Sequence, residues 1–379
     1  NQMSTTLVFS EEVVAEILSW IPVKALMRFR CVSKPWNSLI FTPTFIKLHF
    51  QRSPKNTRVL IDANTFVSSC SLPDLFEDPS SVIHHSCQLV ESSHSVLMVC
   101  KGLVCMLTLN YKYRKFHEFW ARFWNPATRL MSEETTRYQI YENFDCFDLR
   151  YRRFGFGYDD RRDSFDMVLL ILACNYQETE VTVFSVGDNC WKLMFSFFEY
   201  DCPIGGDEPI GEFVSGTINW LVTVPPWSSH HHRKTDDDTM NQIKIFSFDM
   251  KNETYKYMPM PIPIDSEPNL GVLKDCLCFY HDYMKTHFVV WLMREFGVDK
   301  SWTQLLNINY EHLQIYGPYH KETLCMPLCM SEDEDVMLLK NCVDHNLVVY
   351  NKRDNGIRLE EDVKLRSCAA YVPSLFLPY

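Results

Sequence analysis

The chain has 379 residues, enough for one small and one large domain. Its formal net charge of −11 argues against nucleic acid or an anionic membrane as a partner, because both would repel an acidic surface. The first ten residues lack the basic start and apolar core of a secretory signal, and the longest strongly apolar run, residues 167–174, is too short to span a bilayer. We therefore expect no membrane partner and no nucleic-acid partner.

The segment 9–50 predicts three short helices. Ser10 is a candidate N-cap for the first, and Pro22 both ends that helix and is suited to start the second. Ser33 can cap a third helix, and we expect residues 42–44 (TPT) to stop it and open only a short turn. The apolar residues at helical spacing are Val13, Val14, Ile17, Leu18, Ile21, Leu26, Met27, Phe29, Trp36, Leu39 and Ile40.

About forty residues are too few for a self-sufficient core, so left-over apolar side chains on this unit indicate a partner. Two alternatives remain for the same pattern. One is a plain helical hairpin at a domain edge. The other is a helix-turn-helix reader of DNA, suggested by Arg28, Arg30 and Lys34, which the net acidic charge disfavours.

This segment resembles an F-box, the motif that docks a protein onto the Skp-type adaptor of a cullin ubiquitin ligase. Phe9-Ser10 stands where the family has Leu-Pro. The match covers Glu11-Glu12, Ile17-Leu18, residues 21–24, Leu26, residues 28–34, Trp36 and Leu39-Ile40. The resemblance implies a Skp-type adaptor as partner and, through it, a cullin and a RING protein. It implies that the adaptor-binding residues are Phe9, Ser10, Ile17, Leu18, Ile21, Pro22, Val23, Leu26, Val32 and Trp36.

From about Arg58 onward the pattern changes to short apolar runs separated by Gly, Asp, Asn and Pro, which predicts a large all-β domain. Pairs of such runs recur, and the second runs are about 45 to 60 residues apart, close to the blade period of kelch-type propellers. We therefore expect a kelch-like β-propeller of unknown blade number, with a wide β-sandwich as the alternative. The pairs are residues 102–107 with 123–126, 167–173 with 181–187, 216–221 with 243–249, 276–280 with 287–293, and 336–339 with 347–351.

Motifs in this region follow the order seen in the plant F-box-associated domain. They are residues 100–105 (CKGLVC), 123–129 (FWNPATR), 155–159 (GFGYD), 183–185 (VFS), 190–191 (CW), 219–221 (NWL), 246–249 (FSFD), 290–297 (VWLMREFG) and 301–303 (SWT). The chain thus resembles plant F-box proteins of the S-locus and F-box/kelch-like group, although Lys101 stands where that family commonly has Asn. We expect an F-box over residues 5–50 and the β-domain over 51–379.

The resemblance implies a non-enzymatic substrate-recognition subunit of an SCF-type ubiquitin ligase, without cofactor. We expect the unknown target protein to bind long polar insertions of the β-domain, through Trp227, Asp207 and Glu208, because loops on a rigid β-scaffold often carry recognition. The alternatives are a propeller lectin or enzyme with a degenerate F-box, and an adaptor-binding regulator that does not promote degradation. No GxSxG, HExxH or other catalytic signature occurs.

Three sequence patterns could each indicate either a binding site or ordinary loop and strand structure. The glycines of 155–157 (GFG) could bind phosphate, but we interpret them as turn glycines around a strand. Residues 230–238, with three His and three Asp, could hold a metal, but we interpret them as a solvated loop. The acidic run 332–335 could bind a basic partner, but we expect an exposed turn.

The 15 cysteines form no CxxC pair, and several lie inside apolar runs, where a free thiol behaves as a small hydrophobic residue. Free thiols fit a reducing compartment, so we expect a cytoplasmic and/or nuclear protein.

Overall fold

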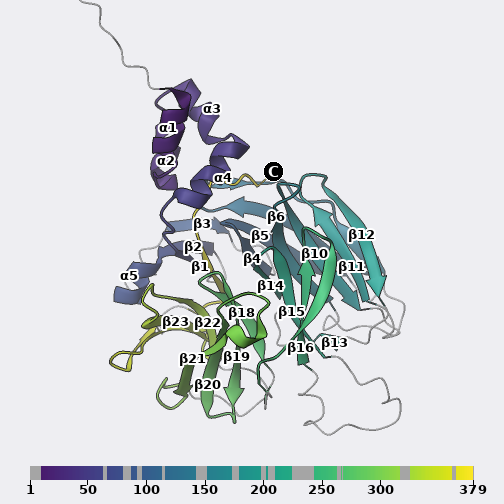
Figure 1. The fold of residues 1–379 in the computed structure, drawn as a ribbon, viewed down its shortest axis with the longest axis vertical. Coiled ribbons are helices and arrows are strands. Elements are labelled where there is room, and N and C mark those ends of the chain that lie inside the picture. Colours follow the sequence, from purple (N-terminus) through teal and green to yellow (C-terminus); the bar gives the residue numbers. More distant parts are fainter. Residues whose placement is uncertain are drawn as a thin grey trace, which may run out of the picture.

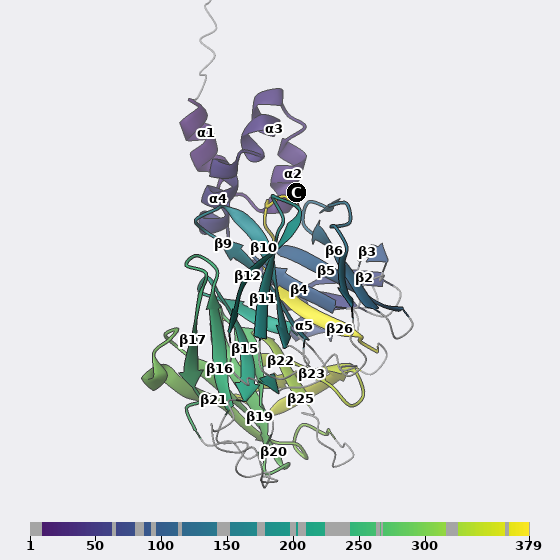
Figure 2. The same cartoon turned by 90° about the vertical axis from the view of Figure 1, so that its right-hand side faces the viewer.

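The structure is a computed structural model in which helices form one end and strands the remainder (Figure 1, Figure 2). It describes residues 10–62, 66–79, 87–91, 96–112, 116–141, 152–172, 179–197, 202–203, 210–223, 243–262, 266, 268–315, 325–360 and 364–378. In these ranges no helix is both long and apolar enough to cross a membrane.

Four helices make up the N-terminal helical unit: α1 (Glu11–Leu18), α2 (Val23–Phe29), α3 (Lys34–Ile40) and α4 (Pro43–Arg52). The first three begin where the sequence predicts. The Ser10 and Ser33 hydroxyls accept backbone N–H bonds at 3.4 and 3.3 Å, which satisfies donors that helix starts leave unpaired.

The short turn expected after residue 42 is wrong, because α4 is a ten-residue helix. The Thr42 hydroxyl accepts a hydrogen bond from the Phe45 N–H at 3.3 Å, and Pro43 occupies the first helical position, where its missing N–H costs nothing. Phe45, Ile46 and His49 then lie buried on the side of α4 that faces the rest of the chain. The predicted division after residue 50 falls inside α4, and where the two domains separate stays a prediction.

The strands form five hydrogen-bonded sheets in the described part of the chain, and the nine-stranded one combines two units, so we number the units as blades one to six. The third and fourth are joined into one larger sheet by a parallel pairing of β9 with β14. In blade order the strands are β26 (Ser367–Tyr371), β1 (Arg58–Asp62), β2 (Phe66–Ser71), β3 (Cys87–Glu91); β4 (Val96–Cys100), β5 (Leu103–Lys112), β6 (Phe116–Asn125), β7 (Leu130–Met131), β8 (Tyr138–Tyr141); β9 (Arg152–Asp159), β10 (Ser164–Leu172), β11 (Thr179–Ser185), β12 (Cys190–Phe197); β13 (Cys202–Pro203), β14 (Ile210–Val214), β15 (Thr217–Thr223), β16 (Ile243–Asp249), β17 (Thr254–Pro259); β18 (Asn269–Leu273), β19 (Cys276–Tyr283), β20 (His287–Met293), β21 (Trp302–Asn309); and β22 (Cys325–Met330), β23 (Val336–Asn341), β24 (Asn346–Asn351), β25 (Gly356–Glu360).

The blades close into a ring, which confirms the predicted propeller. The innermost strands β26, β4, β9, β14, β18 and β22 are neighbours in that order, and β22 returns to β26. Strand β26, from the end of the chain, pairs with β1, from the start of the β-domain, and so completes blade one. Two other elements, α5 (Leu72–Glu77) and the short 3-10 helix η2 (Asp299–Ser301), lie between strands.

The five sequence pairs correspond to the second and third strands of blades two to six, and local turn chemistry explains why they could be recognised. The third strands of blades two, four and six end in Asn125, Asp249 and Asn351, and the side-chain oxygen of each accepts hydrogen bonds from the next turn. Asn125 accepts from the Ala127 N–H at 2.9 Å, and Asp249 accepts from the Lys251 N–H at 2.9 Å. The same residue type therefore recurs at this position in three of the blades.

Gly155 and Gly157 are not turn glycines, which corrects our interpretation. Both lie within β9, at the junction of blades three and four. A Cβ on Gly155 would lie 2.4 Å from Ile218 Cγ2, and one on Gly157 would lie 2.7 Å from the Phe213 ring. These glycines allow the close approach of two blades, and Trp220 Nε1 donates across the junction to the Phe154 carbonyl at 3.1 Å.

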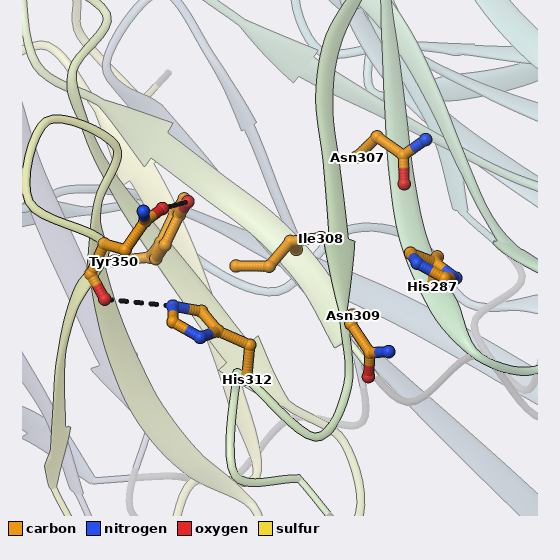
Figure 3. Close-up of a pocket in the computed structure, with 7 residues that line it drawn as sticks. His287, Asn307, Ile308, Asn309, His312 and Tyr350 are labelled. Carbon is orange, nitrogen blue, oxygen red and sulfur yellow. Dashed lines mark hydrogen bonds between the residues drawn. The ribbon is translucent and has the colours of Figure 1, made fainter.

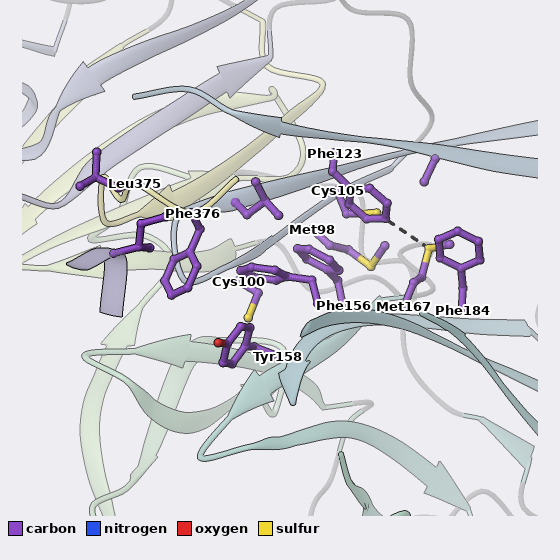
Figure 4. Close-up of a cluster of buried hydrophobic side chains, with 14 of the residues drawn as sticks. Met98, Cys100, Cys105, Phe123, Phe156, Tyr158, Met167, Phe184, Leu375 and Phe376 are labelled. Atoms are coloured by element: carbon purple, nitrogen blue, oxygen red, sulfur yellow. Dashed lines mark hydrogen bonds between the residues drawn. The ribbon is translucent and has the colours of Figure 1, made fainter. Parts of the chain in front are cut away.

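The helical unit and the β-domain share one hydrophobic core. Figure 4 shows the part of this core in which side chains of blades two and three meet Leu375 and Phe376. Side chains of α1, α2 and α4 belong to the same buried cluster as Phe123 and Phe156 of blades two and three. Between them runs a segment that we call the C-terminal strap, residues 372–378. Its Phe376 packs edge-on against Phe50 of α4, with ring centroids 5.4 Å apart, and it contacts Tyr158 and Phe165 of blade three.

Polar contacts show which propeller face the helical unit covers. Lys47 of α4 pairs with Asp163 at 2.8 Å, and Lys55 pairs with Asp275 at 3.1 Å. Both aspartates lie in turns that join the first and second strands of a blade. Since strands within a blade alternate in direction, second-to-third connections emerge on the opposite face. The strand ends that flank residues 204–209 and 224–242 lie on that opposite face.

Candidate functional site: an apolar stripe on the helical unit

The helical unit exposes large apolar side chains along α1. Val13 is 43 %, Ile17 55 % and Trp20 57 % exposed. Their spacing of i, i+4 and i+7 places them on one side of the helix and its end, and we call them the apolar stripe. Val32, between α2 and α3, is 65 % exposed. Exposed apolar side chains gathered on a small unit are typical of a surface that another protein covers.

The structure separates the predicted adaptor-binding residues into layers. Ile17 and Val32 are exposed, Ile21 and Trp36 are half-buried, and Leu18, Val23 and Leu26 are buried. Phe9 lies outside the described residues, and Ser10 and Pro22 are exposed. The buried residues belong to the core beneath α1, so they cannot touch a partner unless that core opens. Whether the exposed ones bind an adaptor stays a prediction.

Sequence reasoning missed Trp20, the largest exposed side chain of the stripe. Trp20 lies just after the end of α1, between the polar Ser19 and the helix-ending Pro22, and the predicted apolar face does not include it. The signal was available, because Trp20 lies three residues after Ile17 and therefore on the same side. Aromatic residues dominate binding energy at protein interfaces, so its exposure is informative.

Helix α4 holds the stripe in place from behind. The His49 imidazole is fully buried, and its Nε2 lies 2.8 Å from the Ile21 carbonyl in the turn between α1 and α2. Arg52 pairs with Glu16 of α1 at 2.5 Å. Burial lowers the pKa of His49, opposed by the hydrogen bond to Ile21, so the neutral ring donates through Nε2. The unit is thus supported by α4 and, through α4, by the β-domain.

The buried His49 predicts an acid-sensitive helical unit. In the unfolded chain His49 has its ordinary pKa of 6.5 and binds a proton below that pH. In the folded protein its pKa is lowered, so the ring stays neutral to a lower pH. The free energy of unfolding should therefore be undiminished above this pH and fall below it, by at most about 1.4 kcal/mol per pH unit. Thermal melts of wild type and His49→Gln between pH 7.5 and 5.5 measure this, since Gln keeps an N–H donor without titrating.

The difference in pH dependence between wild type and His49→Gln reports on His49 alone, because both proteins share the other titrating groups. One of these is Asp166, whose pKa is raised to about 6 by burial. The control is His345→Asn, at an exposed histidine whose positive φ of 58° asparagine tolerates. Equal pH slopes for wild type and His49→Gln would contradict the assignment.

Two family models match the chain, one over its helical unit and one over its strands. Residues 7–48 match the F-box domain, and residues 58–377 match the F-box associated beta propeller domain. The chain is an F-box protein of the F-box associated beta propeller family. The F-box is the helical unit, and the propeller is the β-domain.

Proteins of similar sequence occur in Arabidopsis thaliana. An F-box/kelch-repeat protein is 26 % identical over 78 % of this chain and 78 % of its own length. The F-box protein CPR1 is 23 % identical over 97 % of this chain and 88 % of its own length. Among solved structures, the beta-propeller domain of the trilobed protease from Pyrococcus furiosus aligns over 71 % of this chain and 70 % of that chain, with 10 % identity and a TM-score of 0.34. A likeness this weak carries no information on function.

The other predicted sites have different outcomes. Trp227, Asp207, Glu208 and the stretch 230–238 lie outside the described residues, so target binding there stays a prediction. The acidic run 332–335 forms a turn as expected, but three of its four carboxylates pair with arginines of the propeller. Arg294 binds Glu334 with two hydrogen bonds, and Arg353 binds Asp333 and Asp335. In the described ranges no group of three or more His, Cys, Asp or Glu is arranged to hold a metal.

Proposed function

We propose that this protein is a non-catalytic substrate receptor of an SCF-type cullin ubiquitin ligase. The apolar stripe of the F-box carries the proposal, because it is exposed in the isolated chain and lies at the end remote from most of the propeller. In this reading a Skp-type adaptor covers Ile17, Trp20 and Val32, and it links the chain to a cullin and a RING protein.

The shared core fixes the position of the F-box relative to the propeller. Because α4 and the C-terminal strap pack on blades two and three, the F-box cannot swing freely relative to the propeller. A target held on the propeller would then stay at a set distance from the charged ubiquitin-conjugating enzyme. Proximity of this kind raises effective concentration and needs no catalytic residue in the receptor. We place this activity in the cytoplasm or nucleus, where the buried thiols of Cys105 and Cys278 stay reduced.

The test is reconstitution with the full chain. Proteins that the chain captures from plant extract, with a proteasome inhibitor present, are incubated with Skp-type adaptor, cullin, RING protein and the ubiquitin cascade. We expect captured proteins to become ubiquitinated with wild type and not with Ile17→Asp, which should still capture them.

Each other result has a distinct meaning. Capture and adaptor binding without ubiquitin transfer would identify a regulator that sequesters its target. Capture that free sugars abolish would identify a lectin. Failure of the wild-type chain to bind any Skp-type adaptor would overturn the proposal.

A further inference from the structure

An open pocket of about 510 Å³ lies between blades five and six (Figure 3). Its described lining residues are three asparagines, two histidines, Ile308 and Tyr350, without a carboxylate, lysine or arginine among them. Asn355 is bonded within the wall, because its carbonyl lies 3.0 Å from His312 Nε2 and its side-chain oxygen accepts from the Tyr350 hydroxyl at 2.9 Å. The pocket therefore offers no charge that would select a class of ligand. Buried charge is gathered elsewhere, where blade three meets blade four.

Three carboxylates surround the guanidinium of Arg162 at this junction. Asp159 ends β9 and Asp166 lies on β10, whereas Glu253 lies in the turn between β16 and β17 of blade four. Arg162 Nε is 3.3 Å from Asp159 Oδ2, and Nη1 is 3.6 Å from Asp166 Oδ2. Its Nη2 pairs with Glu253. The side chains of the two aspartates are 0 % and 1 % exposed, so one guanidinium is shared by two fully buried carboxylates and a third that is half-buried.

The two buried aspartates are unequally stabilised as anions. Asp159 Oδ1 accepts the Arg161 backbone N–H at 2.8 Å, while its Oδ2 makes no hydrogen bond with any described residue. Asp166 has longer contacts. The Ser164 hydroxyl donates to Asp166 Oδ1 at 3.4 Å, and the 3.6 Å from Asp166 Oδ2 to Arg162 Nη1 exceeds hydrogen-bond distance. The geometry thus identifies Asp166 as the carboxylate that a proton would relieve most.

The balance of charge around Asp166 points the same way. Burial raises the pKa of Asp166 to about 6, and the negative charge of Asp159 adds to the rise. The positive charge of Arg162 and hydrogen bonds from Ser185 and Ser164 oppose it. Burial is the largest of these effects, so the ionised form of Asp166 is disfavoured in the folded protein.

The other charged groups near Arg162 are already paired. Arg161 reaches Glu253, with Nη2 3.5 Å from Oε1. Asp188 and Lys192, whose charges also act on Arg162, pair with each other at 2.7 Å and are exposed. They therefore do little to neutralise the two buried aspartates.

The turn that carries Arg162 also contacts the F-box. Asp163 of this turn pairs with Lys47 of α4 at 2.8 Å, and Asp160 pairs with Lys101 of blade two at 2.8 Å. Lys101 Nζ lies 3.7 Å from the centre of the Tyr158 ring. Ion pairs of a single turn thus connect α4 with blades two, three and four. A change of charge at the base of this turn acts where the F-box rests on the propeller.

We propose that Asp166, Asp159 and Arg162 form a proton-sensitive joint that ties blade three to blade four next to the F-box. When both aspartates are ionised, Arg162 is divided between them and Glu253, and the two buried negative charges repel each other. When Asp166 takes up one proton from solvent, a single buried anion remains, and Arg162 holds Asp159 and Glu253 together across the junction. This joint belongs to the propeller itself and goes beyond the proposed function, on which it does not depend.

The direction of the pH effect follows from the two pKa values of Asp166. In the unfolded chain the ordinary value of 3.8 applies, and in the folded protein the pKa is about 6, so between these values the folded state binds the proton and the unfolded state does not. The folded protein is therefore penalised above pH 6, and the penalty is relieved as the pH falls toward 4. His49 of the F-box has the opposite effect, because acid destabilises the unit that it supports.

Urea unfolding of the full chain between pH 7.5 and 4.5 tests the joint with Asp166→Asn, which keeps the size of the side chain but cannot ionise. At pH 7.5 we expect the unfolding equilibrium constant of the variant to be lower than that of wild type by up to about 100-fold. The difference should shrink by about tenfold per pH unit below pH 6, because wild-type Asp166 is then protonated. His49 is present in both proteins and does not contribute to the difference.

The matched control is Asp188→Asn, the same substitution at an exposed aspartate of blade three. The hydrogen bond from Lys192 lowers the pKa of Asp188, so loss of its charge should stabilise the protein at no pH. Equal stabilisation by Asp188→Asn and Asp166→Asn would show that net charge, and not the joint, is responsible.

Two further variants separate a coupled cluster from the simple burial of one aspartate. Asp159→Asn removes a like charge and should move the midpoint of the pH effect down, whereas Arg162→Gln removes the opposite charge and should move it up. In wild type, hydrogen exchange corrected for its intrinsic pH dependence should slow in turns 160–163 and 250–253 between pH 7.5 and 5.5, and in Asp166→Asn it should not. The proposal is overturned by an Asp166→Asn protein that is no more stable than wild type at pH 7.5, by parallel pH profiles, or by a midpoint that neither neighbouring variant moves.

Discussion

Ile17→Asp should abolish capture of a Skp-type adaptor and leave the melting temperature close to that of wild type. Ile17 is 55 % exposed, so in the free protein the carboxylate is solvated and costs little. In the complex it would be buried against apolar surface without a partner, which costs several kcal/mol. Titration calorimetry against purified adaptor measures the loss, and Trp20→Ala should weaken binding by about 2 kcal/mol or more.

The neighbouring residue supplies the matched comparison. Leu18→Asp should also lose adaptor binding, but by unfolding the F-box, because Leu18 is only 2 % exposed. Its melting temperature should fall sharply, whereas that of Ile17→Asp should not. Leu193→Asp, at an exposed leucine of the propeller, controls for an added surface charge. Normal adaptor affinity in Ile17→Asp and Trp20→Ala together would show that the apolar stripe is not the adaptor site.

Phe376→Ala should destabilise the protein by about 3–5 kcal/mol and separate the unfolding of the F-box from that of the propeller. Phe376 packs against Phe50, Tyr158 and Phe165, so its loss leaves a cavity where the two domains meet. Wild type should unfold in one calorimetric transition, because one core spans both domains. The variant should show two transitions, the earlier one matching increased hydrogen exchange in α4.

Phe376→Leu is the graded control, since it keeps most of the apolar volume and should lose less stability.

A second variant, Asn125→Ala, tests the strap by its polar contacts. The Asn125 amide donates to the carbonyls of Ser374 and Phe376 at 3.0 and 2.8 Å, and its removal leaves both buried acceptors unsatisfied. A single unchanged transition in both Phe376→Ala and Asn125→Ala would show that the strap does not couple the domains.

Features that depend on neighbours in sequence were predictable. Ser10 and Ser33 cap helices because a hydroxyl reaches the N–H three residues later, whatever the fold. Asn125 and Asp249 end third strands because their side chains close the next turn. These local signals were sufficient to place three helices and five strand pairs, and their order carried the likeness to F-box proteins with a propeller.

Features that depend on distant parts of the chain were not predictable from these patterns. Blade one is assembled from β26 and β1, whose sequence separation hides it from any repeat, so the blade number needed the closed ring. Gly155 lies inside β9, where Ile218 of the next blade leaves no room for a Cβ, and this contact between blades has no signal in the local sequence.

The exposed surface of α1 was likewise not predictable from the sequence pattern alone. Helical periodicity groups Ile17 with Leu18, yet only packing by α2 and α4 decides that Leu18 points into the core and Ile17 to solvent. Local patterns were thus sufficient to predict three of the four N-terminal helices and the strand pairs of five blades, and the order of the motifs indicated the family. Which side chains stay exposed depends on tertiary packing, because the burial of a face depends on the partner that it meets.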